Sequence, residues 1–234
     1  MTNSENTHIR YGRTFHLPFS PGMSRDDKKI RSLEKFEGQE VVATIKYDGE
    51  NTTIKKELFH ARSPDSRHNF TRNWIKQLHA AIGPEIPDGW RLCGENVSYF
   101  HSIEYKNLES FFYLFSVWDE KGQRLHFDEM LEIAEIFDLA VPEVLYRGPF
   151  DLKVLEKIAK TFDIVNHEGF VVTTTKGFHH SEFSEYMAKW VRAGHVQPNE
   201  DDSAEFWMKN TYPNKLRDPS KVKPSYMPGY LGPK

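Results

Sequence analysis

The chain has 234 residues, with 31 Lys or Arg against 34 Asp or Glu and a single cysteine. A formal net charge of -3 excludes the strongly basic composition of many nucleic-acid-binding domains, so a polyanionic ligand would have to meet a local basic patch. One cysteine excludes a disulfide framework and is typical of a reducing compartment. The sequence contains neither a secretory signal nor an apolar run of about 20 residues, the length of a membrane span. We expect a cytoplasmic protein without a membrane partner.

The two ends of the chain differ in composition from the middle. Residues 1–24 mix polar residues with His, Pro and Gly, and residues 211–234 hold five prolines, which do not fit inside helices or central strands. We therefore expect an N-terminal extension over 1–24 and one folded domain over 25–210. The Pro-rich tail over 211–234 is expected to lie along the surface or to be partly disordered.

The first half of the domain predicts both helices and strands. Asp26–Phe36 has acidic residues at its start, as is typical of a helix N-terminus. Gln39–Lys46 is rich in β-branched residues and predicts a strand, with a turn at Asp48-Gly49 and a second strand over Asn51–Lys55. Apolar residues then recur at helical spacing over 71–82.

The second half continues the mixture. Helical spacing recurs over Met130–Phe137 and again over Leu152–Phe162, with Asp151 as the candidate N-cap of the latter. Four further segments are typical of strands: Trp90–Val97, Phe111–Trp118, Gly169–Thr175 and Tyr186–Val191. Because strands and helices do not alternate strictly, the sequence predicts an α+β fold of mostly antiparallel sheets flanked by helices.

Charged residues in the predicted strands are the main chemical signal. Lys46 ends a hydrophobic strand just before a turn, and a semi-buried amine near other cations has a lowered pKa and can act as a nucleophile. Taken alone, the Lys-x-Asp-Gly match favours a surface lysine beside a β-turn, because so short a pattern often arises by chance. Three more charges, Glu95, Glu168 and Lys189, lie in or next to predicted strands, where burial is costly unless a ligand or a metal meets them.

Five short motifs contain these residues in a fixed order. They are Lys-x-Asp-Gly at Lys46, Gly-Glu at Glu95, an aromatic strand at Phe115, Glu-Gly before hydrophobic residues at Glu168, and a strand lysine at Lys189. This order resembles that of the covalent nucleotidyltransferase superfamily, which comprises polynucleotide ligases and messenger-RNA capping enzymes. The resemblance implies a nucleotidyltransferase domain, the ATP-grasp-like adenylylation domain of ligases.

Within that superfamily the chain resembles the RNA ligases, in its compact size and in Asn51, which stands five residues after Lys46. The resemblance implies that Lys46 attacks the α-phosphate of ATP and forms lysyl-AMP. AMP would pass to an RNA 5′-phosphate, and a 3′-hydroxyl would then displace it, as in RNA repair. Glu168 is the implied ligand of Mg²⁺ or Mn²⁺. The implied nucleotide-binding residues are Thr44, Ile45, Asn51, Arg62, Arg67, Glu95, Phe115 and Lys189.

The sequence departs from the family pattern in three places. The fifth motif commonly has two lysines one residue apart, but Met187 and Val191 flank Lys189 at that spacing, so which family lysine it represents stays open; Arg192 is a candidate substitute. Ser116 stands where an Asp usually follows the aromatic residue. Only 45 residues follow Lys189, too few for the usual OB-fold domain, so we expect RNA to be held by local basic residues or by a partner protein.

Other functions remain open at this point. One is a non-catalytic nucleic-acid-binding protein with a ligase-like fold; retention of Lys46, Glu95, Glu168 and Lys189 favours the enzyme over it. Within the enzymes, a DNA ligase and a GTP-dependent capping guanylyltransferase are the alternatives.

Overall fold

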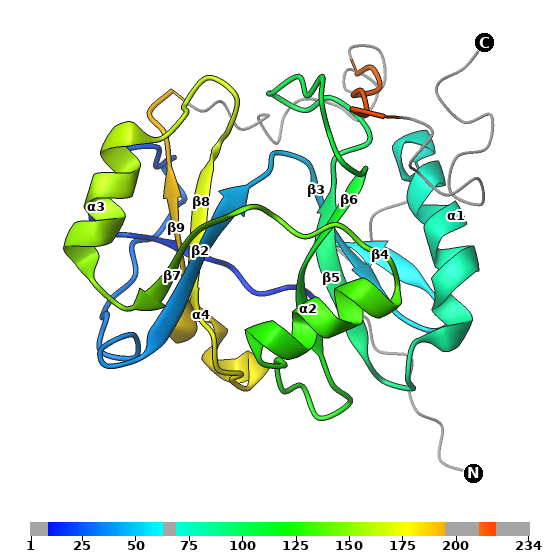
Figure 1. Ribbon diagram of the computed structural model, residues 1–234, viewed down its shortest axis with the longest axis horizontal. Helices are drawn as coiled ribbons and strands as arrows, with labels where there is room; N and C mark the ends of the chain where they lie inside the picture. Colours follow the sequence, from blue (N-terminus) through cyan, green and yellow to red (C-terminus); the bar gives the residue numbers. More distant parts are fainter. Residues whose placement is uncertain (1–8, 63–68, 195–210, 219–234) are drawn as a thin grey trace.

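The computed structural model describes residues 9–62, 69–194 and 211–218 and contains two β-sheets side by side, with helices on their outer sides (Figure 1). In the two sheets of the described chain, β1 and β9 are the only parallel neighbours. The predicted α+β fold with mostly antiparallel sheets is thus confirmed. None of the helices in the described ranges has the length and apolar character needed to cross a bilayer.

The first sheet has the strand order β1-β9-β8-β2-β7. Its strands are β1 (Phe15–His16), β2 (Glu40–Lys46), β7 (Val144–Pro149), β8 (Gly169–Thr174) and β9 (Met187–Val191). Lys46 pairs with Gly169, while Val171 pairs with Thr44 on one side and Lys189 on the other. Because paired residues, and residues two apart on a strand, point to the same face, Lys46, Thr44 and Lys189 share one face of this sheet.

The second sheet has the order β4-β3-β5-β6. Its strands are β3 (Glu50–Ile54), β4 (Phe59–Ala61), β5 (Arg91–Asn96) and β6 (Phe112–Trp118). Asn51 pairs with Glu95, so their side chains share a face. The register shifts between Cys93 and Gly94, which leaves Phe115 of β6 without a cross-strand partner. Such a bulge re-aims the extra side chain.

Three hydrophobic clusters hold the sheets and helices together. Helix α3 (Leu152–Thr161) covers the outer face of the first sheet, where Leu155 packs with Phe170. Helices α1 (Asn73–Ile82) and α2 (Phe127–Ile136) pack on the second sheet, and the short α4 (Phe183–Tyr186) precedes β9. A third cluster links the inner sides of the two sheets and consists of Tyr11, Cys93, Trp118, Phe178, Phe183 and Met187.

Most predicted elements are confirmed to within three residues, but the predicted helix over Asp26–Phe36 is wrong. This segment consists of turns and one isolated bridge between His16 and Lys29. Its carboxylate Asp27 makes an ion pair with Lys189 and contacts the His16 ring instead of standing at a helix start. Strand β7 is also missing from the prediction, because its Gly-Pro end disguises an edge strand.

Residues 211–218, which fall in the predicted C-terminal tail, pack against the second sheet. Leu216 is 8% exposed and belongs to the same hydrophobic cluster as α1. The buried side chain of Asn214 accepts a hydrogen bond from the Tyr105 N–H and donates one to the Val97 carbonyl, both at 2.9 Å. This segment therefore contributes to the core despite Pro213.

Candidate active site

Lys46 and Glu168 form the centre of the candidate site. The Lys46 Nζ lies 2.5 Å from the Glu168 Oε2, and the Glu168 side chain is only 2% exposed. The contact depends on Gly169, which follows Glu168 and pairs with Lys46. A Cβ on Gly169 would lie 1.9 Å from the carbonyl oxygen of Trp190, so only glycine lets β8 and β9 approach this closely.

Burial by itself lowers the pKa of Lys46, but the Glu168 and Glu95 carboxylates outweigh burial and raise the pKa above its ordinary value. In the absence of ligands the amine is therefore a paired ammonium. An ammonium has no free electron pair, so Lys46 could act as a nucleophile only after a ligand changed its surroundings.

Glu95 faces Lys46 from the second sheet. Burial raises the pKa of Glu95 to about 8, and Glu168 and Asp48 add to the rise while Lys46 opposes it. Asn51, paired with Glu95, has a buried Oδ1 without a hydrogen-bond partner among the described residues. A buried amide oxygen of this kind is available to a hydrogen-bond donor on a ligand.

Lys189 is held on the same sheet face by residues that precede the first long strand. Its Nζ lies 3.3 Å from the Asp27 Oδ1, and the two side chains are 10% and 7% exposed. Asp27 Oδ2 also contacts the Nε2 of the fully buried His16 at 3.3 Å. Burial lowers the pKa of His16 to about 4, and Lys189 contributes to this shift, so His16 is neutral near pH 7. The Asp27 carboxylate thus balances the charge of Lys189.

The turn after Lys46 is fixed by Asp48. Its Oδ2 accepts hydrogen bonds from the N–H and the Oγ of Ser102, both at 2.7 Å, and from the Ile103 N–H at 3.1 Å. The Asp48 N–H donates to the Tyr105 hydroxyl at 2.8 Å. Asp48 of the first motif therefore anchors the turn after Lys46 to a second loop.

The predicted phosphate-binding arginines are only partly described. The Arg62 N–H donates to the Asn51 carbonyl at 2.9 Å, and its side-chain Nε is buried without a partner among the described residues. Burial lowers the pKa of Arg62, and the nearby Arg10 and Arg13 lower it further. Arg67 lies outside the described residues. Arg192 is the candidate substitute for the second lysine of the fifth motif, and its backbone N–H donates to the Glu168 carbonyl at 3.0 Å.

The remaining predicted nucleotide-binding residues differ in orientation. Thr44 is partly exposed on the face that carries Lys46. Ile45 points to the opposite face and is 5% exposed, so only its backbone borders the site. Phe115 is partly buried, with the ring of Tyr11 edge-on at 5.3 Å between centroids.

The comparison with protein families decides the classification. The model of the RNA ligase family matches residues 39–191. The chain belongs to the RNA ligase family. All five motif residues lie within the match, and Asn51 and Arg62 lie there as well.

Solved ligases share the fold of this RNA ligase family member. A putative ATP-dependent DNA ligase from Aquifex aeolicus has a TM-score of 0.51 at 20% identity, over 78% of this chain and 49% of that one. A Naegleria gruberi RNA ligase with PPi has a TM-score of 0.51 at 19% identity, over 72% of this chain and 56% of that one. An archaeal ATP-dependent RNA ligase has a TM-score of 0.50 at 14% identity, over 73% of this chain and 48% of that one. The chain thus spans about half the length of these structures. No curated protein matches its sequence significantly.

Sequence reasoning missed Tyr11, His16 and Asp27, which lie outside the family match but contact site residues within it. Tyr11 and His16 fall in the predicted polar extension and Asp27 in the predicted helix, and no local pattern connects either segment with Lys189. A signal is present only in the composition of the first segment, since the apolar run Phe15-His16-Leu17 is unusual in a solvated extension.

Proposed function

We propose that this protein is an ATP-dependent RNA ligase that forms lysyl-AMP on Lys46, transfers AMP to an RNA 5′-phosphate and seals that end to a 3′-hydroxyl. The observation that carries the proposal is the pairing of Lys46 with the buried Glu168, on the sheet face that also holds Lys189. Glu168 and Lys189 are buried charges, which are costly even when paired, and the partly exposed Lys46 beside them leaves these charges open to a charged ligand. This cost argues against a non-catalytic protein.

Glu168 also fits a divalent cation. The described residues contain no group of three His, Cys, Asp or Glu for an ion, so Mg²⁺ or Mn²⁺ would be held by Glu168, water and phosphate oxygens, as Mg²⁺ usually is. Such an ion would neutralise phosphate charge during the transfer. Glu168 cannot fully balance both a second cation and the Lys46 ammonium. Burial would then lower the pKa of Lys46 and favour the neutral amine.

The other residues suit the parts of an adenylate. Phe115 and Val171 are partly buried apolar side chains from the two sheets, against which an adenine ring can pack. Glu95 and Asn51 offer hydrogen bonds to ribose hydroxyls. Lys189 and Arg62 supply positive charge for phosphate oxygens.

Labelling with nucleotide tests this function. The protein is incubated with α-³²P-ATP and Mg²⁺ or Mn²⁺. A labelled protein band with the acid lability and alkali stability of a phosphoramidate is expected for wild type and not for Lys46→Ala. Lys76→Ala removes an exposed lysine on α1 and is the matched control, which should label like wild type. An unlabelled wild type, or equal labelling of Lys46→Ala, would contradict the proposal. Labelling by GTP alone would favour a capping guanylyltransferase.

A sealing assay then addresses the substrate. We expect joining of 5′-phosphorylated RNA to a 3′-hydroxyl end, consistent with cytoplasmic RNA repair and with a partner protein that adds RNA affinity. Better sealing of nicked DNA than of RNA ends would favour a DNA ligase.

A further inference from the structure

We propose that Phe100 and Tyr212 form a stacking platform for a base of the RNA strand whose end is sealed, an inference that rests on the proposed function. Their rings lie parallel, with centroids 4.8 Å apart and an interplanar angle of 8°. Tyr212 is 42% exposed and is the only aromatic among the large apolar side chains that are strongly exposed in the described part of the chain. An exposed aromatic face stacks on any nucleic-acid base, without sequence preference.

The platform is held in place by the protein itself. The Phe100 N–H donates to the Tyr212 carbonyl, and the Thr211 Oγ1 donates to the Phe100 carbonyl, both at 2.8 Å. Two residues further on, the Asn214 N–H donates to the Ser98 carbonyl at 3.0 Å. The exposed ring is thus pre-positioned, which reduces the entropy that binding would otherwise cost.

The same loop reaches the reacting centre. Phe100 is followed by His101 and by Ser102, whose N–H and Oγ bind the Asp48 carboxylate two residues beyond Lys46. Burial lowers the pKa of His101, and Glu168 and Lys46 are close enough to act on its charge. In Figure 1 the tip of β2, where Lys46 lies, and the segment 211–218 are at the same end of the molecule.

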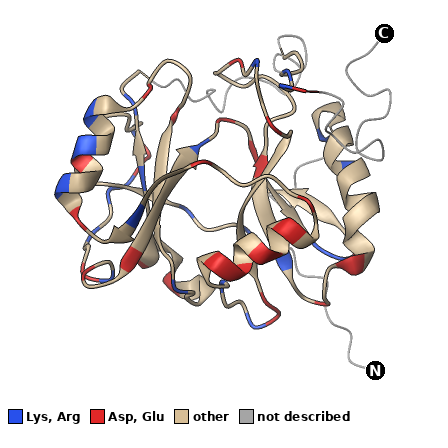
Figure 2. Cartoon of the chain, in the orientation of Figure 1, with Lys and Arg blue, Asp and Glu red and all other residues tan. Residues whose placement is uncertain are grey.

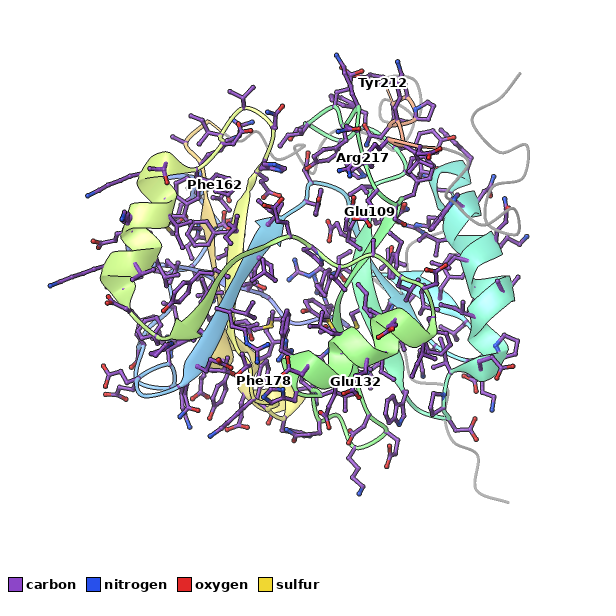
Figure 3. The ribbon with its side chains drawn as sticks, in the orientation of Figure 1. Glu109, Glu132, Phe162, Phe178, Tyr212 and Arg217 are labelled. Atoms are coloured by element: carbon purple, nitrogen blue, oxygen red, sulfur yellow. The ribbon has the colours of Figure 1, made fainter. Side chains whose placement is uncertain are left out.

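The charges around Tyr212 are compatible with an approach of RNA from this end. Lys215 and Arg217 are exposed beside Tyr212, and neither makes an ion pair within the described residues. Helix α2 is acidic, and its Glu132 lies at the opposite end of the molecule from Tyr212 and Arg217 (Figures 2 and 3). Glu109 also lies near Arg217, so this surface carries charges of both signs. The feature that distinguishes this location is therefore the stacked ring pair and not its charge.

The variant Tyr212→Ala tests the platform, with Tyr212→Phe as the conservative variant. The probe is a fluorescent, 5′-phosphorylated single-stranded RNA, whose binding is followed by anisotropy. Loss of one base stack should weaken binding between about fivefold and about 150-fold for Tyr212→Ala, while Tyr212→Phe stays near wild type. Val165→Ala removes a side chain that is 79% exposed elsewhere and should change nothing.

Lysyl-AMP labelling separates this inference from the proposed function. Tyr212→Ala should label like wild type, because the ring lies outside the nucleotide-binding residues, and should be slow only in reactions with RNA. RNA binding equal to wild type would overturn the platform, and so would loss of labelling in a folded Tyr212→Ala. An unlabelled wild type that still loses RNA affinity on Tyr212→Ala would contradict the ligase proposal and leave the platform as an RNA contact.

Discussion

Replacing Asp27 by Asn should both destabilise the protein and slow the formation of lysyl-AMP. Asp27 is the carboxylate that balances Lys189, at 3.3 Å, and it also accepts hydrogen bonds from the Ser24 N–H at 3.0 Å and Ser24 Oγ at 2.8 Å. Asn keeps the shape of Asp and one acceptor oxygen, so the substitution removes the charge and little else. It leaves the Lys189 ammonium buried without its partner.

The magnitude follows from the burial of the pair. With side chains only 10% and 7% exposed, breaking a buried ion pair costs about 3–5 kcal/mol. Because the hydrogen bonds from Ser24 can persist and burial already lowers the pKa of Lys189, we expect the lower end, about 3 kcal/mol, at pH 7.

The dependence on pH has a definite sign. Burial opposes ionisation of Asp27, but the Ser24 N–H and Lys189 outweigh burial and hold the pKa of Asp27 below its ordinary value. A carboxylate with a depressed pKa stabilises the fold above its ordinary pKa near 4 and loses that contribution as the pH falls. The difference between wild type and Asp27→Asn should thus be full at pH 7 and shrink below about pH 4.

Urea unfolding at several pH values, together with nucleotide labelling at pH 7, measures both effects. The matched control is Asp26→Asn, which changes the adjacent, exposed carboxylate. In a double-mutant cycle, Asp27→Asn should cost less unfolding free energy in the Lys189→Met background than in wild type, by about 1 kcal/mol or more. Unfolding within about 0.5 kcal/mol of wild type, or equal losses in Asp26→Asn, would refute the reasoning.

Three further changes have defined outcomes. Glu95→Gln should gain stability relative to wild type as the pH rises from the ordinary carboxyl range through about 8. Over this range the unfolded wild type ionises Glu95, whereas burial disfavours the charge in the folded state. An equal stability difference between Glu95→Gln and wild type at pH 6 and pH 9 would contradict this. Gly169→Ala should cost about 1–3 kcal/mol and also reduce labelling, since its Cβ would clash with the Trp190 carbonyl; unchanged denaturant midpoint and labelling would contradict it. Leu155→Ala should cost about 2–5 kcal/mol in denaturant unfolding, since this side chain of α3 is fully buried against the first sheet. Its folded fraction should label normally, and a specific loss of labelling would show that α3 affects the site.

Local sequence patterns determined the elements that carry the motif residues. The β-branched run before Lys46 forms β2, and Asp151 caps α3 by accepting a hydrogen bond from the Lys153 N–H at 2.8 Å. These features depend on neighbours a few residues away, so propensity, periodicity and capping suffice to predict them. The order of charged residues in strands likewise indicated the family that the residues 39–191 match.

Tertiary structure alone decided how the charges meet. Lys46 and Glu168 are 122 positions apart, and Lys189 and Asp27 are 162 apart, so their pairing depends on strand register and on burial, neither of which has a local signal. The segment around Asp27 shows the consequence: its acidic start favours a helix locally, but the buried lysine of β9 binds the carboxylate more strongly than a helix terminus on the surface would. Electrostatic attraction in a low-dielectric interior acts only once folding has brought the partners together.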